Sequence, residues 1–205
     1  SYENVSELFT LLQQKFVDIR KRIVKFHHAV ETKLIAIPTT SGTGSEVTPF
    51  AVITDDKTHV KYPLADYELT PQIAIVDPEF VMTVPKRTVA LSGLDTLSHA
   101  LESYVSVMAS DFTRPWSLEA IKLVFENLVE SYNYDPKNPT LAGEKARENM
   151  HYAATLGGMA FANAFLGINH SIAHKVGGEF GLPHGLCISI AMQPVIRFNG
   201  TSGKV

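Results

Sequence analysis

The chain has 205 residues, 45% of them hydrophobic, which is enough for one or two globular domains. Its 18 Lys and Arg residues are balanced by 21 Asp and Glu residues, and the formal net charge of −3 leaves no basic excess for binding nucleic-acid phosphates or acidic lipids. The longest weakly polar stretch, 157–168, is too short to cross a bilayer, so we expect no membrane span and no secretory signal.

The first third of the chain alternates helix and strand patterns. Apolar residues at three- and four-residue steps predict an amphipathic helix over 5–26. Two short apolar runs, 34–37 and 72–76, are typical of strands that are buried on both faces. Between them, 50–54 predicts a third strand, which would end at a turn formed by the two aspartates 55–56. Strands punctuated by helices indicate an α/β layer with a parallel component.

From about residue 86 onward, the pattern predicts helices only. Apolar stripes and an Ala- and Gly-rich segment place five of them, at 90–108, 116–128, 143–165, 168–180 and 186–198. We therefore predict a partial α/β domain over 1–86 and a helical domain over 87–205.

Carboxylate and imidazole side chains gather in the helical part. Asp95 and His99 lie four residues apart, so they project from one face of a helix and could chelate a cation or hydrogen-bond to each other. His170 and His174 have the same spacing, and His184 follows in a Pro-His-Gly turn. Any one of these histidines could be a core residue bonded to a backbone carbonyl. Three of them in an apolar, Gly- and Ala-rich setting favour a metal site.

The single cysteine, Cys187, narrows the kind of metal site. It excludes an internal disulfide and a cysteine-based zinc site, and it is typical of a reducing, cytoplasmic compartment. Nitrogen and oxygen ligands suit Fe(II) or Zn(II). One carboxylate with neutral imidazoles would leave the cation a net positive charge, so it would polarise an alcohol oxygen and lower its pKa.

A loop rich in Thr, Ser and Gly, 39–46, follows the first predicted strand. Its backbone N–H groups and hydroxyls could receive a phosphate, although many strand-to-helix turns have this composition. It is neither a GxGxxG motif nor a P-loop. Lys61 could add a positive charge against a phosphate or ribose, or it could be an ordinary surface lysine.

Four motifs, in this order along the chain, resemble the iron-dependent (group III) alcohol dehydrogenases. They are 38–48, 93–100, 170–174 and 183–185. Three further segments, 16–22, 61–67 and 160–167, resemble the alcohol dehydrogenase half of the bifunctional aldehyde-alcohol dehydrogenases. Together the motifs extend over nearly the whole chain.

The resemblance implies a role for each candidate site residue. The metal ligands would be Asp95, His99, His170 and His184, holding Fe(II), with Zn(II) as the alternative. His174 would lie beside the substrate and outside the metal shell as the catalytic proton relay, whereas spacing alone would pair it with His170. The residues assigned to the NAD(H) cofactor are Thr39, Thr40, Thr43, Thr48, Phe50 and Lys61.

The implied fold is a truncated Rossmann-like α/β dinucleotide domain followed by an all-α, metal-binding domain of the dehydroquinate synthase-like type. The implied activity is NAD(H)-linked interconversion of a primary alcohol, with ethanol expected, and its aldehyde by hydride transfer in the cleft between the domains. Family members carry a Gly-Gly-Gly-Ser phosphate loop before the region where this chain begins. We therefore expect a middle piece of a longer bifunctional enzyme that forms homo-oligomers and helical filaments.

Two other functions remain open from the sequence. The same four ligands could serve a metal-assisted lyase or hydrolase with water as the nucleophile. Alternatively, the chain could be a catalytically incomplete fragment that acts in filament assembly, through a head-to-tail contact that does not close.

Overall fold

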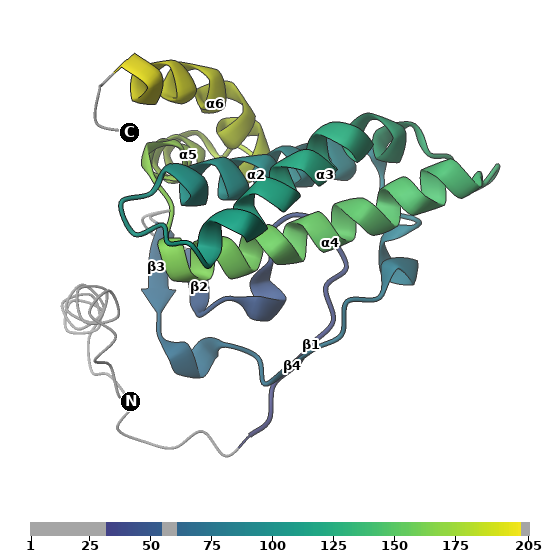
Figure 1. Ribbon diagram of the computed structural model, residues 1–205, viewed down its shortest axis with the longest axis horizontal. Helices are drawn as coiled ribbons and strands as arrows, with labels where there is room; N and C mark the ends of the chain where they lie inside the picture. The colour runs from purple at the N-terminus through teal and green to yellow at the C-terminus, as the bar shows by residue number, and fades with distance from the viewer. Residues whose placement is uncertain (1–31, 55–60, 202–205) are drawn as a thin grey trace.

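The computed structural model describes residues 32–54 and 61–201, which form a helical body with short strands beside it (Figure 1). The helices are α2 (Lys86–Val105), α3 (Thr113–Asn133), α4 (Leu141–Ala164), α5 (Ile168–Phe180) and α6 (His184–Thr201). All five predicted helices are therefore confirmed. The helix predicted over 5–26 lies outside the described residues.

Four helices, α2, α3, α4 and α6, begin two to four residues earlier than predicted. α3 starts at Thr113, so Pro115 lies in its first turn, where a proline is tolerated because the N–H groups there have no partner within the helix. α6 starts at His184 instead of residue 186. His184 is thus the first residue of a helix, and its prediction as a turn residue was wrong.

The core lies where α2, α3 and α4 pack together, and the three helices run side by side in Figure 1. Leu97, Val124, Met150 and Ala153 form its buried centre. A second cluster joins α5 to α6 through Ala173, Cys187 and Ile188. No helix of the described part combines the length and the apolar character that a membrane span requires.

The two predicted apolar strands pair, but they are not buried. β1 (Ile35–Ala36) and β4 (Ile73–Ala74) are parallel, with Ile35 opposite Ile73, as the sequence indicates. Ile35 is 52% exposed and Ile73 is 51% exposed, so the predicted burial on both faces was wrong. A parallel strand is buried on both faces only where other layers cover it, and this pair forms a sheet of two strands among the described residues.

A second small sheet lies beside the helices (Figure 1). The predicted strand β2 (Phe50–Thr54) is confirmed, and it pairs in antiparallel fashion with β3 (Lys61–Ala65), which the sequence did not predict. Short 3₁₀ turns, η1 (Ser45–Val47), η2 (Tyr67–Leu69) and η3 (Pro78–Val81), complete this part.

Candidate metal centre

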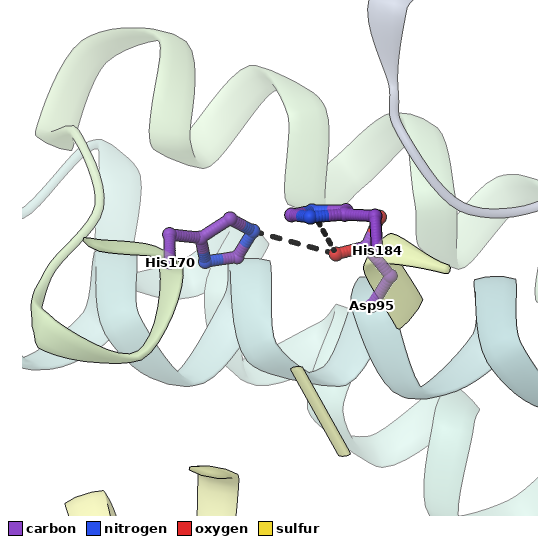
Figure 2. Close-up of side chains that lie close together, drawn as sticks. All are labelled: Asp95, His170 and His184. Carbon is purple, nitrogen blue, oxygen red and sulfur yellow. Dashed lines mark ion pairs between the residues drawn. The ribbon is translucent and has the colours of Figure 1, made fainter. Parts of the chain in front are cut away.

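Three helices bring the candidate metal ligands together. Asp95 and His99 lie on α2, His170 lies in the first turn of α5, and His184 opens α6. One ligand atom each from Asp95, His170 and His184 lies within 4.8 Å of the others. Figure 2 shows the rings of both histidines directed at the Asp95 carboxylate.

One carboxylate oxygen is at the centre of the cluster. Asp95 Oδ1 lies 3.3 Å from His170 Nε2, 3.4 Å from His184 Nε2 and 3.6 Å from His99 Nε2. His99 is the most distant of the three, and it is not a member of the compact set of Asp95, His170 and His184.

Two orphaned atoms show that these residues fit a cation. Asp95 Oδ1 and His170 Nε2 are buried, and neither makes a hydrogen bond among the described residues, although the two atoms lie 3.3 Å apart as an ion pair. Buried polar atoms without partners are rare in native structures. A divalent cation of the Fe(II) or Zn(II) type would satisfy both atoms with the nitrogen and oxygen ligands that such metals accept.

Burial and charge set the protonation of the cluster. Burial alone would raise the pKa of Asp95, but the His99, His170 and His184 rings outweigh it and hold this pKa well below its usual value. Burial lowers the pKa of His99 to about 4, so its ring is neutral at pH 7. Burial also opposes the charge on His170, but the Asp95 and Glu102 carboxylates prevail and raise its pKa to about 9.

The cluster opens into a cavity of about 640 Å³. Its walls include the apolar side chains Phe161, Phe165 and Leu166, and all four predicted metal ligands line it. His174 lines it as well, with its ring centre 5.2 Å from that of His184 and 6.2 Å from that of His170. His174 thus lies next to the cluster and is not a member of the compact set.

The predicted cofactor residues divide into two groups. Thr43, Thr48 and Phe50 line the same cavity as the metal candidates. Thr39 and Thr40 are not among its lining residues, and Thr39 is exposed. Lys61 is the first residue of β3, opposite Thr54 in the register.

The Thr/Gly loop, residues 39–48, is held against α2 and α4. Thr96 Oγ1 donates to the Ser41 carbonyl at 3.1 Å, and His99 Nδ1 lies 3.2 Å from the Gly42 carbonyl. On the α4 side, Thr155 Oγ1 donates to the buried Glu46 carboxylate at 2.7 Å. His99 therefore contacts both the Asp95 carboxylate and the loop.

Close approach of two backbones fixes the same loop. Gly44 has a φ of +59°, which favours glycine. A Cβ added to Gly158 of α4 would lie 2.8 Å from the Gly44 carbonyl oxygen. The Ala- and Gly-rich sequence of α4 thus makes room for this loop. The loop leads into the single 3₁₀ turn η1.

Sequence reasoning missed Glu102. This buried residue contacts His170 Nδ1 directly. It lies three residues after His99 and seven after Asp95, a spacing that places all three on one face of a helix. The spacing could have identified it, whereas only the structure shows that α5 places His170 against it.

Comparison with known protein families identifies matches over most of the chain. Residues 89–204 match the model described as Fe-containing alcohol dehydrogenase family, C-terminal, and residues 6–78 match the model described as iron-containing alcohol dehydrogenase.

Two curated relatives illustrate the similarity. Aldehyde-alcohol dehydrogenase 2 of Entamoeba histolytica is 58% identical over 200 residues, and the bifunctional aldehyde-alcohol dehydrogenase of Escherichia coli K12 is 55% identical over 199. Each match covers 97% of this chain. The chain spans only 22% of the length of each relative.

Solved structures are also similar to this chain. The iron-containing alcohol dehydrogenase of Thermococcus thioreducens has a TM-score of 0.78 and 39% identity, over 87% of this chain and 44% of that one. Sulfoacetaldehyde reductase of Bifidobacterium kashiwanohense, solved in complex with NAD+, has a TM-score of 0.74 and 35% identity, over 82% of this chain and 43% of that one.

Proposed function

Because the chain belongs to the iron-containing alcohol dehydrogenase family, we propose that the protein interconverts a primary alcohol and its aldehyde with iron and NAD(H). Ethanol and acetaldehyde are the expected pair, since the curated relatives described above are aldehyde-alcohol dehydrogenases. The observation that carries the proposal is the convergence of Asp95, His170 and His184 at a cavity that the Thr/Gly loop also lines.

In the proposed site, Asp95, His99, His170 and His184 hold Fe(II), with Zn(II) as the alternative. When bound, the cation supplies Lewis-acid polarisation of the alcohol oxygen. Only an unprotonated imidazole nitrogen can bind a metal, so His170, whose pKa is about 9, would release a proton as the cation binds, whereas the His99 ring is already neutral.

The cavity wall positions the organic partners. Phe50 stacks on Phe161 with ring centres 5.9 Å apart and meets Phe165 edge-on at 6.0 Å. This apolar wall excludes water from the reacting carbons and gives the nicotinamide ring a flat surface to pack against. Thr43 and Thr48 also line the cavity and supply hydroxyls for the cofactor's polar groups.

His174 is the proposed proton relay. Its ring lines the cavity and lies 5.2 Å from the His184 ring, and imidazole titrates near neutral pH. It is therefore suited to exchange the alcohol's proton with solvent.

We assign residues 1–86 to part of a Rossmann-like dinucleotide domain and residues 87–205 to part of the helical metal-binding domain. The two family matches, 6–78 and 89–204, and the change from strands to helices at Lys86 support this boundary. The exposed apolar strands β1 and β4 support it too, since further layers of a larger domain would cover them.

Location and assembly complete the proposal. We place the protein in the cytoplasm, in keeping with the free thiol of Cys187, and expect a homo-oligomer, with helical filaments as one form. Light scattering of the full-length protein at rising concentration tests the assembly. A monodisperse monomer would contradict it.

The deciding experiment uses the full-length protein, loaded with Fe(II) or Zn(II). We expect acetaldehyde to drive loss of NADH absorbance, and His184→Ala to reduce the alcohol dehydrogenase rate to background because it removes one residue of the cluster. No turnover with either metal, together with an unchanged rate in the variant, would overturn the proposal.

A further inference from the structure

Glu102 caps the helix that carries His170. The residue is only 6% exposed, and its Oε1 accepts the backbone N–H of Gly167 at 3.0 Å and of Asn169 at 2.8 Å. These groups stand at the start of α5, whose own N-cap, Gly167, offers no side chain. The first N–H groups of a helix lack partners within it, and a carboxylate there is also favoured by the helix dipole.

The second oxygen of the same carboxylate faces the His170 ring. Glu102 Oε2 contacts His170 Nδ1 and also accepts the Ser98 hydroxyl at 3.2 Å. A carboxylate oxygen can only accept, so Nδ1 must carry the hydrogen. In the neutral ring this tautomer leaves the lone pair on Nε2, the atom that lies 3.3 Å from Asp95 Oδ1.

The carboxylate belongs to a buried network that joins the three helices of the cluster. Asn169 Nδ2 of α5 donates to Ser98 Oγ of α2 at 2.8 Å and to the Ile188 carbonyl of α6 at 3.2 Å. A side-chain network that spans all three helices restricts their relative movement. The contacts of Glu102 thus bear on the ring of His170 and on the backbone that carries it.

We infer that Glu102 is a positioning residue for the metal centre, because its carboxylate keeps a hydrogen on His170 Nδ1 and fixes the ring so that Nε2 is the nitrogen offered to a cation. The inference rests on the proposed function. Capping alone needs only Oε1, so the contact of Oε2 with the ring is the part that a purely structural role would not require. Partners of this kind raise metal affinity by about 10- to 100-fold.

Glu102→Gln separates the capping of α5 from the contact with the His170 ring. The amide oxygen can still accept the N–H groups of α5, but the amide nitrogen is then a donor facing His170 Nδ1. That donor favours the opposite tautomer, with hydrogen on Nε2. In the full-length protein, stripped of metal, we expect the Kd for Zn(II), measured by chelator competition, to rise about 10- to 100-fold. The visible absorption of bound Co(II) should also change, because its ligand field reports the coordinating nitrogens.

Asp66→Asn is the matched control. Asp66 is a second buried carboxylate, it caps η2 by accepting the Glu68 backbone N–H at 3.1 Å, and it is not among the residues that line the cavity. We expect its Zn(II) affinity to stay within about twofold of wild type, well below the change expected at Glu102. Equal losses in the two variants would overturn the inference, since they would report a general effect of losing a buried charge.

The remaining outcomes separate this inference from the proposed function. A wild-type protein that binds no Zn(II) or Fe(II) would overturn both. A wild-type protein that binds Zn(II), with Glu102→Gln binding equally well, would overturn only the role of Glu102. If Glu102→Gln does not unfold cooperatively, Glu102→Asp decides. Affinity below wild type then supports the inference, because the carboxylate is withdrawn by one methylene, and wild-type affinity overturns it.

Discussion

At the scale of single residues, Arg147 is a buried cation without a carboxylate partner among the described residues. It is 2% exposed, and its guanidinium donates to the Val81 carbonyl at 2.9 Å and to the Val84 carbonyl at 3.1 Å. The Tyr134 ring lies 5.4 Å from its central carbon. Arg147 therefore ties α4 to the segment that leads from η3 into α2.

Arg147→Lys should destabilise the protein although it keeps the charge. A single ammonium cannot reproduce the planar fork that reaches two carbonyls. We expect a loss of about 2–4 kcal/mol in the free energy of unfolding, measured by denaturant titration of the full-length protein. Arg114→Lys, at an exposed ion pair, is the control and should change it little. Similar stabilities for the two variants would contradict the assigned role.

We expect His151 to account for part of the fall in unfolding free energy at low pH. The residue is buried, and its Nδ1 lies 3.2 Å from Ser41 Oγ. Burial lowers its pKa below the usual value of 6.5, with Glu46 and Asp77 opposing. The unfolded chain therefore takes up a proton at a higher pH than the folded chain does, and stability falls as the pH drops below about 6.5.

His151→Gln should flatten this dependence. Glutamine keeps a polar group beside Ser41 but does not titrate. The slope of unfolding free energy against pH, between pH 7 and 5, should decrease by at most about 1.4 kcal/mol per pH unit. Measurements on the metal-free protein avoid a contribution from the cation, and an unchanged slope would disprove the effect.

At the scale of elements, the contact between the Thr/Gly loop and α4 predicts that alanine is tolerated at Gly157 but not at its neighbour Gly158. A Cβ on Gly158 would meet the Gly44 carbonyl oxygen at 2.8 Å and Gly44 Cα at 2.9 Å, so backbone must move. A Cβ on Gly157 would find nothing nearer than 3.7 Å.

Gly158→Ala should therefore cost about 1–3 kcal/mol of stability and weaken NADH binding, because it displaces the loop. Gly157→Ala should leave both close to wild type. The measurements are thermal unfolding and a fluorescence titration with NADH. Equal NADH affinities in the two variants would show that the loop does not depend on this contact.

The same elements show what sequence patterns can and cannot predict. Three- and four-residue spacing located α2 to α6, because each helix buries one side against its neighbours. The burial of β1 was mispredicted, since an apolar run reports what a strand can pack against and not which layers cover it. Asp95 and His99 could be paired from spacing, because both lie on α2. Only the packing of α5 and α6 against α2 brings His170 and His184 to the same carboxylate.

At the scale of the whole molecule, the metal should stabilise the fold by joining α2, α5 and α6. Binding to the folded state alone, at 100 times the Kd, contributes about 2.7 kcal/mol. We expect Zn(II) to raise the thermal midpoint of the metal-free full-length protein, and a chelator to reverse the change. His170→Ala should abolish the response. A midpoint that does not respond to the cation would contradict a metal site at this junction.

Because Cys187 is buried, the reactivity of its thiol reports the movement of α6. The thiol is 3% exposed, lies one turn after His184, and packs in the α5–α6 cluster with Ala173. A thiol reagent can reach it only when α6 separates from α5, so the labelling rate counts openings of the helix that carries His184. A cation that bridges Asp95 and His184 would make these openings rarer. The labelling rate of Cys187 would then report how often α6, and with it His184, leaves the metal centre.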